Sequence, residues 1–585
     1  MTLDQLFDLR PIIQVLIKIR LQVAARRKDR IYFGTLVNRQ HPDIVAEEVD
    51  KMLPPRRTWA KFRPRRKERA GLSSTEINQR AIYRATLSSY RCGELHETEW
   101  GRALDDFWYE MRQYLEEKRS LSPGRPLLIK KGSSKSRNAP QQFRLLFPPR
   151  TLHERVFLNI IARYLRAAFD DDLDSSVYAF RDQRGAQAAP IADLLIYRKR
   201  HPGQPLFAAE ADIQSFFDTI GHPSVNSSVA DHVEKARARG IEVDPRALKV
   251  IEQTLSSYSF QKSITMAKQE PGLENFNRHI ATPPEELLKE LREKYGANGF
   301  GLAQGGPLSA VLANLVLASA DARVKAVPGS DAGFYARYCD DIVILHPSKD
   351  CCRKMLDQYL VGLDQQGLKH HAADEGPLTD RQYFDAKTLL PYRWGSNLVD
   401  PDHRTWISFL GYHIHHDGRL RLRRSTVRNE HDKQIRLVDR IFRNIDRQLV
   451  AGEDVDESIH VHFRAAMRLA SMSVGRLPHR FQGNEVGQPC WSSAFPLLQP
   501  NRSILAQLRA LDHGRERQLS RLRRGLARRG LTTTWPLEHE FWRPKHFTYL
   551  GAPFSYHAML QDSSRPAIPD QSAVHPRNIF NSSYR

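Results

Sequence analysis

The stretch that most constrains the fold is residues 334–345, which read FYARYCDDIVIL. Two adjacent carboxylates, Asp340 and Asp341, lie between two runs that are rich in aromatic and β-branched residues, and such runs predict buried strands. The acids are therefore expected at the tip of a strand–turn–strand unit, where burial and mutual repulsion both disfavour their charged forms. Two interpretations follow. The acids lie in a solvated hairpin turn, or they bind a divalent cation such as Mg²⁺, which prefers oxygen ligands.

The charge of the chain predicts a polyanionic partner. The chain has 585 residues, of which 41% are hydrophobic, a composition typical of a globular protein with several structural units. Lys and Arg number 89 against 67 Asp and Glu, which gives a net charge of +22 and a pI of about 9.8. Nucleic acid is the simplest partner for such an excess of positive charge.

Cysteine usage and the N-terminal residues predict a soluble protein of the cytoplasm. The five cysteines form no C-x-x-C pair, which argues against a zinc ribbon, and their low number suits a reducing compartment. The apolar run at residues 12–17 is followed at once by Lys18 and Arg20 and is too short to span a membrane. No membrane association is expected.

A basic hairpin is expected before the central region. Residues 127–129 and 143–147 form two short apolar runs around a Gly- and Ser-rich tip, a pattern that favours paired strands. The cations of this hairpin are Lys130, Lys131, Lys135, Arg137 and, on the return strand, Arg144. Their ammonium and guanidinium groups would suit a triphosphate, and the alternative is a solvated charged surface.

Apolar spacing predicts helices over residues 100–115, 152–169, 308–324 and 425–450. In the last helix the expected buried stripe is Ile435, Val438, Phe442, Ile445 and Leu449. A parallel basic stripe consists of Arg436, Arg440, Arg443 and Arg447. Residues 406–414 and 419–424 are expected to be strands of a hairpin that turns at Asp417–Gly418.

Three features in a fixed order point to phosphoryl transfer. Asp212 ends a predicted strand over residues 206–213, a glycine-rich loop with Gln304 precedes the apolar helix, and Asp340–Asp341 follows after one more strand. Transfer from a nucleotide uses two metal ions about 3.5–4 Å apart, held by carboxylates. One metal activates the attacking hydroxyl, and the other neutralises the leaving pyrophosphate.

Four motifs resemble those of reverse transcriptases. They are DIQSFFDTIGH at 212–222, GLAQGGPLSAVLANLVL at 301–317, YCDD at 338–341, and FLGY at 409–412, which resembles the primer-grip hairpin. The tracts at 131–148 and 178–181 look like the fingers and pre-palm segments of group II intron and retron-type enzymes. The resemblance covers roughly residues 120–450, and the order and spacing of its motifs make it specific.

The resemblance implies a role for each matching residue. Two Mg²⁺ ions, or Mn²⁺ in their place, would be held by Asp212, Asp340 and Asp341 with Ile213. Phe217 would lie under the sugar and exclude a 2′-hydroxyl, Gln304 would touch the nascent pair or the template, and Arg144 and then Lys131 would bind the triphosphate. The primer and the nucleic-acid backbone would meet Tyr338, Gly411 and the four arginines of residues 436–447. Core packing, a turn or a solvated charge is the alternative for each residue outside the three acids, and a structural role is expected for His222.

The chain also departs from the family pattern. The family often carries an Asn-x-x-Lys-Thr pattern after the Tyr-x-Asp-Asp strand, whereas residues 367–376 read GLKHHAADEG, which puts a proton donor for pyrophosphate in doubt. Cys339 stands where alanine is commoner, and neither the Asn-Ala-x-x-His tract of retron enzymes nor a His/Cys-rich endonuclease tail is found. The chain looks most like bacterial defence-associated reverse transcriptases, including the abortive-infection group.

The expected fold is an α+β right-hand polymerase with fingers, a ferredoxin-like palm and a helical thumb, extended by helices at both ends. The expected domains are a basic N-terminal extension at 1–120, fingers and palm at 121–424 with a helical insertion at 223–300, a basic thumb at 425–530 and a tail at 531–585.

The expected function is RNA-directed DNA polymerase, adding dNTPs to a 3′-hydroxyl in anti-phage defence. The expected partners are an RNA template or non-coding RNA, a DNA product, dNTPs, and a second copy of the chain or an operon-encoded protein. The alternatives are a group II intron maturase-like enzyme and a non-catalytic RNA-binding scaffold. The template, the priming group and the oligomeric state stay open. Tyr549, Tyr556 and Tyr584 are candidate primers by residue type only.

Overall fold

The computed structural model describes the chain in two compact units. The described residues are 2–32, 44–65, 68, 72, 74–122, 124–131, 142–181, 187–270, 273, 280–373, 378–396, 403–452, 461–474, 491, 495–499, 501–531 and 553–555. The first unit comprises Met1–Leu16 and Leu95–Arg419, and the second comprises Ile17–Glu94 and Leu420–Arg585. Polymerase subdomains need not coincide with compact units, so the expected domain boundaries stay a prediction.

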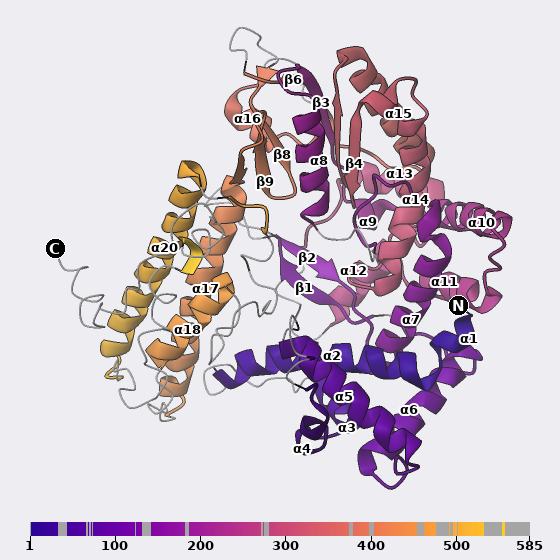
Figure 1. The fold of residues 1–585 in the computed structure, drawn as a ribbon, viewed down its shortest axis with the longest axis vertical. Coiled ribbons are helices and arrows are strands. Elements are labelled where there is room, and N and C mark those ends of the chain that lie inside the picture. The colour runs from indigo at the N-terminus through magenta and orange to yellow at the C-terminus, as the bar shows by residue number, and fades with distance from the viewer. Residues whose placement is uncertain are drawn as a thin grey trace. The chain divides into compact units, whose positions relative to one another are not determined.

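A five-stranded sheet organises the first unit, in the order β4-β5-β3-β6-β7 (Figure 1). Its strands are β3 (Leu206–Ala211), β4 (Phe334–Tyr338), β5 (Asp341–His346), β6 (Leu389–Trp394) and β7 (His403–Arg404). β3 lies in the middle and pairs antiparallel with β5 and β6, while β7 alone runs parallel to its neighbour. The predicted strand–turn–strand at 334–345 is the antiparallel pair of β4 and β5.

Two long helices pack together beside this sheet. α14 (Pro307–Lys325) contacts α15 (Lys349–Gln365), which in turn contacts β3, β5 and β6. α14 is apolar on nearly all sides, a pattern that predicts a buried helix. Among the described residues it alone has the length and composition of a membrane span, and most of it is buried in the fold, as in a core helix.

Further helices surround α14. α7 (Leu152–Phe169) begins with a capping box, in which Thr151 Oγ1 accepts from the Glu154 amide and the Glu154 carboxylate accepts from the Thr151 amide. Both α7 and α10 (His222–Ala238) contact α14. The other helices of the first unit are α1 (Leu3–Leu6), α6 (Glu99–Leu115), α8 (Ala189–Arg200), α9 (Phe216–Thr219), α11 (Pro245–Ser257), α12 (Phe260–Gln269), α13 (Glu285–Tyr295) and α16 (Asp380–Asp385). The expected helical character of residues 223–300 is thereby confirmed.

The two predicted hairpins differ in outcome. β1 (Leu127–Lys130) and β2 (Phe143–Leu146) pair as expected, although the tip with Lys135 and Arg137 lies outside the described residues. The continuous strand expected at 406–414 is wrong, because the chain reverses between β8 (Trp406–Phe409) and β9 (Tyr412–His415). Leu410 and Gly411 have φ values of 47° and 85°, the left-handed backbone that two-residue hairpin turns require. The turn at Asp417–Gly418 is confirmed by the bond from Gly418 N to His415 O, 2.8 Å.

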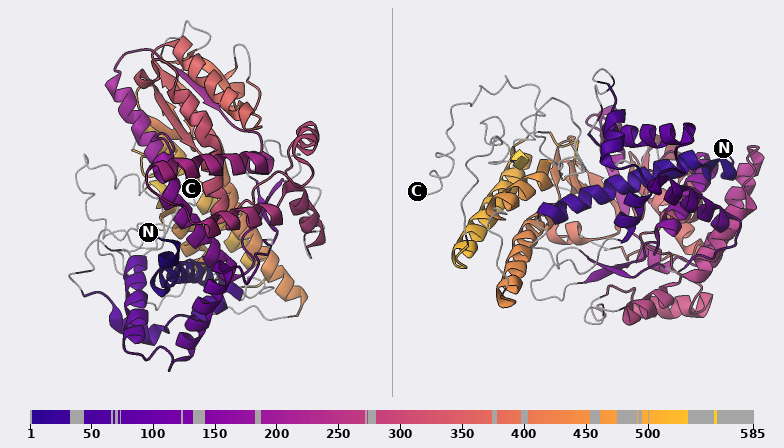
Figure 2. Two further views of the ribbon diagram at one scale, coloured as in Figure 1. Left: turned by 90° about the vertical axis from the view of Figure 1, so that its right-hand side faces the viewer. Right: turned by 90° about the horizontal axis from the view of Figure 1, so that it is seen from below.

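Helices form most of the second unit. α17 (Arg424–Val450), α18 (Val461–Val474) and α20 (Arg502–Ala527) share one apolar core, and α17 lies beside α20 (Figure 2). The other elements of this unit are most of α2 (Leu9–Tyr32), then α3 (Ile44–Lys51), α4 (Arg56–Trp59), α5 (Ser74–Arg91) and β10 (Leu420–Leu422).

The apolar stripe predicted for α17 is partly wrong. Ile435 and Leu449 are 38% and 43% exposed, whereas Ile441 is buried together with Val438 and Ile445. Packing against α18 and α20 selects the face that continues through Gln434, four residues before Val438.

Part of the predicted C-terminal tail is anchored to α20. The amides of Phe554 and Ser555 each donate to the buried carboxylate of Asp512 at 3.0 Å, and Ser555 Oγ donates to it at 2.7 Å. The Phe554 ring packs against Trp491. Residues 553–555 therefore belong to the core of the second unit.

Candidate active site

The acidic pair lies at a strained turn between β4 and β5. Tyr338 pairs with Asp341, so Cys339 and Asp340 form the turn itself. Cys339 has a φ of 61°, a conformation that a non-glycine residue holds only when the surrounding structure enforces it. Both acids are half-buried. The position at the tip of a hairpin, which the sequence predicted, is what the structure has.

Strand register brings Asp212 to the end of the sheet at which the β4–β5 turn lies. Ala211 of β3 pairs with Ile342 of β5, so the next residues on the two strands are Asp212 and Asp341. Asp212 is 7% exposed. The pKa of Asp340 is raised by burial and by the negative charge of Asp212, which places these two carboxylates within electrostatic reach of each other.

Lys387 supplies a positive charge that the sequence analysis missed. Its Nζ forms an ion pair with Asp212 Oδ2, and His371 Nε2 lies 3.8 Å from the same oxygen. Burial lowers the pKa of His371, although the charge of Asp212 opposes the shift. The sequence signal for this lysine was the Lys387–Thr388 dipeptide, which matches the end of the Asn-x-x-Lys-Thr pattern but comes later in the chain than residues 367–376.

The acidic side chains of the site are of the chemical type that Mg²⁺ prefers, because their ligand atoms are carboxylate oxygens. Among the residues that the structure describes, no three His, Cys, Asp or Glu side chains lie close enough together to hold a metal ion. The Lys387 ammonium already lies on Asp212, so a cation is favoured there, and the raised pKa of Asp340 indicates a negative charge that lacks compensation. Ile213 is buried, and its backbone forms an isolated antiparallel β-bridge with His370. Metal binding by Asp340, Asp341, Asp212 and Ile213 stays a prediction.

The glycine-rich loop lies against α9 and β2. The Gln304 carbonyl accepts from Phe147 N at 2.7 Å, and the Phe217 carbonyl accepts from Leu302 N at 2.7 Å. Gly305 has a φ of 96°, a backbone conformation that suits glycine. Phe216 is buried while Phe217 is half-buried, as expected if only one of the two rings packs in the core.

Asp218 connects the predicted nucleotide-binding residues and was not identified from the sequence. Gln304 Nε2 donates to Asp218 Oδ1 at 2.8 Å. Burial raises the pKa of Asp218 to about 6, against the opposing effects of the Gln304 hydrogen bond and of the charges on Arg144 and Lys131. Arg144 and Lys131 are both exposed. One predicted residue, Gln304, thus contacts this carboxylate, and the charges of two others, Arg144 and Lys131, favour its ionised form.

A buried ionic network lies beneath the acidic turn. Arg337 of β4 is 0% exposed and donates through Nη2 to Asp321 Oδ2 of α14 at 2.7 Å. Its Nη1 donates to Asn314 Oδ1 at 3.1 Å and to the carbonyl of Cys339 at 3.3 Å. Burial works against its charge, but Asp321 keeps the pKa of Arg337 above its usual value. A charged residue within a buried strand was the sequence signal.

The remaining predicted residues lie on β4, in the β8–β9 turn and on α17, and Tyr338 pairs with Asp341. Tyr338 is half-buried beside the acidic turn, and Gly411 lies in the turn between β8 and β9. Arg440, Arg443 and Arg447 are exposed on α17, where Arg436 is half-buried. His222 Nε2 bonds to the Gly301 carbonyl at 2.9 Å, which agrees with its expected structural role.

Comparison with known proteins identifies the class of the first unit's core. Residues 129–373 match the family model described as Reverse transcriptase (RNA-dependent DNA polymerase), and this span contains the three acids and Gln304. The chain therefore carries a reverse transcriptase domain at these residues. The expected α+β polymerase class is confirmed, and β3, β4 and β5 lie within the matched residues.

Solved structures of telomerases are similar at low scores. Telomerase from Candida albicans in complex with the TWJ fragment of telomeric RNA has a TM-score of 0.31 and 12% identity, over 77% of this chain and 66% of that one. Apo telomerase from Candida tropicalis has a TM-score of 0.33 and 10% identity, over 82% and 79%. The chain thus covers just under two thirds of the first of these, and at such scores the likeness carries no conclusion. No curated protein matches the chain.

Proposed function

We propose that the protein is an RNA-directed DNA polymerase that adds dNTPs to a 3′-hydroxyl by metal-assisted phosphoryl transfer. The observation that carries the proposal is the meeting of Asp212 with the Asp340–Asp341 turn at one edge of the palm sheet, inside a reverse transcriptase domain. Carboxylates on rigid strands are the ligands that two-metal phosphoryl transfer uses.

Each residue of the site has a role in this proposal. Asp212, Asp340 and Asp341 would hold Mg²⁺, which would activate the attacking hydroxyl and neutralise the leaving pyrophosphate. Phe217 would lie beside the sugar and reject a 2′-hydroxyl. Lys387 holds a proton at Nζ beside Asp212, from which the leaving pyrophosphate would be protonated.

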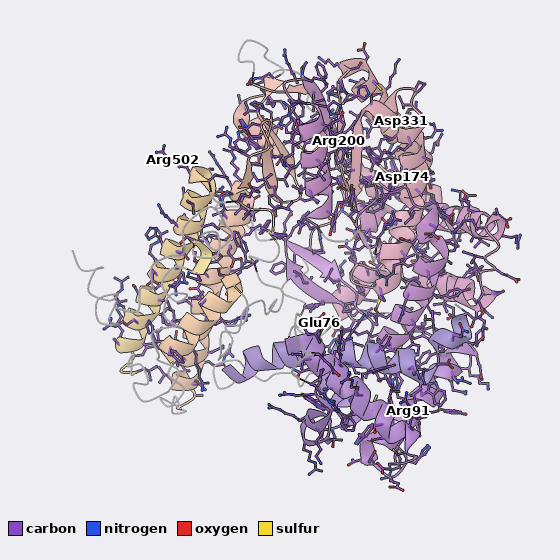
Figure 3. The ribbon with its side chains drawn as sticks, in the orientation of Figure 1. Glu76, Arg91, Asp174, Arg200, Asp331 and Arg502 are labelled. Atoms are coloured by element: carbon purple, nitrogen blue, oxygen red, sulfur yellow. The ribbon has the colours of Figure 1, made fainter. Side chains whose placement is uncertain are left out.

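Substitution of Asp340 by Asn tests the proposal. The change removes the carboxylate and also the charge that burial and Asp212 disfavour, so Asp340→Asn should abolish Mg²⁺-dependent dNTP incorporation on an RNA template while the fold persists. Asp331→Asn is the matched control, since Asp331 is exposed just before β4 (Figure 3). Full synthesis by Asp340→Asn would overturn the assignment.

Thermal unfolding gives a second readout, independent of synthesis. Because the folded protein holds a proton on Asp340 more tightly than the unfolded chain, the stability contributed by this group is greatest at low pH and falls as pH rises through its raised pKa. Mg²⁺ should compensate that charge, so the rise in Tm on adding Mg²⁺ should be larger at pH 7.5 than at pH 5. Asp340→Asn should lose most of the rise, and Asp331→Asn should keep it.

We also propose a role in anti-phage defence with a non-coding RNA. This part rests on the resemblance of the motifs and of the long extensions to the defence-associated group, and on the net charge of +22, which favours retention of RNA. Its test is the nucleic acid that the protein retains, discussed below at the scale of the whole molecule.

A further inference from the structure

Asp218 is an acid of the site to which metal binding gives no role. It lies on α9, six residues after Asp212, and is half-buried between the glycine-rich loop and the β1–β2 hairpin. Its carboxylate accepts a hydrogen bond from Gln304 Nε2 at 2.8 Å. A carboxylate that is kept partly desolvated must have its charge compensated, and here the partners are residues predicted to face the nucleotide.

The bond to Asp218 fixes which end of the Gln304 amide is available. An ionised carboxylate only accepts hydrogen bonds, so the amide nitrogen of Gln304 must face it. The main-chain carbonyl of Gln304 is also held, by Phe147 N at 2.7 Å. Gln304 is therefore anchored at both ends. Its Oε1 has no hydrogen-bond partner among the described residues, so it can accept a bond from a hydroxyl or amino group of a substrate.

The charges around Asp218 come from the hairpin. Arg144 on β2 and Lys131 just after β1 both stabilise its ionised form. In the described part of the chain, a further titratable group near it is Tyr258, between α11 and α12, since burial and the charge of Asp218 raise the pKa of that phenol. The two cations of the hairpin thus favour the ionised form of the carboxylate that Gln304 contacts.

We propose that Asp218 is a positioning residue for the incoming nucleotide, acting through Gln304 and through the hairpin cations Arg144 and Lys131. It orients Gln304 so that Oε1 is presented to a hydrogen-bond donor of the nucleotide. It also holds the two cations close to the place where the triphosphate would bind. The inference rests on the proposed function and deepens it, because it assigns the nucleotide selectivity of that site to a residue outside the metal ligands.

Nucleotide binding before chemistry is the first test. The dNTP Kd is measured on a template–primer complex with Ca²⁺ in place of Mg²⁺, and KM and kcat are measured separately with Mg²⁺. Asp218→Ala should weaken dNTP binding about 10-fold or more, the loss typical of a hydrogen bond to a charged group, and should raise KM more than it lowers kcat. Asp218→Asn, which can still accept from Gln304, should recover part of the affinity. Asp231→Asn, an exposed acid on α10, is the matched charge control.

A double-mutant cycle tests whether Asp218 acts through Gln304. If it does, adding Asp218→Ala to Gln304→Ala should weaken dNTP binding by much less than Asp218→Ala does alone. Additive effects would overturn the inference, as would an Asp218→Ala variant that binds dNTP like the control. Failure of the proposed function is a different result, namely a wild type that binds dNTPs but synthesises no DNA. In that case the dNTP Kd values of the wild type and of Asp218→Ala, both measured with Ca²⁺, still decide the role of Asp218.

The pH dependence separates positioning from a purely structural role. Asp218 is protonated below a pKa of about 6, so the wild-type Kd for dNTP should rise between pH 7.5 and pH 5.5 more steeply than that of Asp218→Asn. The phosphates and metal ligands titrate alike in both proteins. Since its pKa is raised on folding, Asp218 is most favourable to stability at low pH, and Asp218→Asn should melt at a higher temperature than the wild type at pH 7.5. Equal pH dependence in both proteins would contradict the inference.

Discussion

Single residues of this site keep conformations and charges that the protein could otherwise avoid. Cys339 holds a left-handed backbone, Asp340 has a raised pKa, and Asp218 has a pKa of about 6. Each is unfavourable to folding by itself, and such features concentrate where function requires them. Lys387 is the counterpart, since its ammonium compensates the negative charge of Asp212.

Lys387 carries the prediction at this scale. Lys387→Met should lower kcat for dNTP incorporation by about 10²-fold, the lower end of the range for loss of a general acid, with little change in the dNTP KM. Lys387→Arg should recover little of the rate, since guanidinium holds its proton too tightly. Lys369→Met is the matched control, because Lys369 is exposed in the stretch where the family pattern places a lysine. Unchanged kcat with a lower Tm would make Lys387 a structural counter-ion instead.

The β4–β5 hairpin depends on support from beneath. Arg337 connects the Asp321 carboxylate on α14 with the carbonyl of Cys339 in the turn, and Asn314 continues the network to the carbonyl of Ala179. The hairpin itself was expected because both of its flanks are rich in aromatic and β-branched residues. Its support was not, because a sequence pattern does not show which helix packs under a given strand.

Breaking this buried pair should affect stability and synthesis differently. Arg337→Met leaves the Asp321 carboxylate buried without its partner and should lower the free energy of unfolding by about 3–5 kcal/mol in urea titration. The double variant Arg337→Met/Asp321→Leu should regain much of that stability, since an apolar pair replaces the ion pair. Synthesis should stay impaired in the double variant, because Cys339 O has lost its donor. A stable double variant with wild-type activity would show that the network does not position the turn.

At the scale of the molecule, a reverse transcriptase domain is joined to a second unit that is helical and basic. α17 exposes Arg440, Arg443 and Arg447. Seven further arginines lie in the last part of α20 and directly after it, at residues 515, 517, 521, 523, 524, 528 and 529. With a net charge of +22, the protein is expected to retain RNA through purification at low salt and to release it steeply as salt rises.

Sequencing the RNA and DNA that co-purify with the wild type and with Asp340→Asn tests the role of the whole protein. The wild type should carry a short, defined RNA together with DNA, and Asp340→Asn should carry the same RNA without the DNA. A structured intron RNA would favour the maturase-like alternative. The same DNA in both samples would show that the protein did not synthesise it.

Local pattern by itself determined a large part of this protein. The helices at 100–115, 152–169 and 308–324, the β4–β5 hairpin with its acids, and the order of the motifs all follow from residue type and spacing, because they depend on near neighbours. The errors in α17 and at Leu410–Gly411 arose where packing and turn geometry, rather than periodicity, chose the outcome.

Tertiary structure decided what the acidic pair is placed beside. Strand register brings Asp212 to Asp341, Lys387 reaches Asp212 across 175 residues of sequence, and Gln304 reaches Asp218 across 86. No local pattern encodes such contacts, because they depend on how a sheet pairs and how a loop crosses it. The sequence alone determined that residues 334–345 carry two acids at a turn. The fold decided that those acids share an edge with a third acid and a lysine, and that a fourth acid lies under the predicted nucleotide-binding loop.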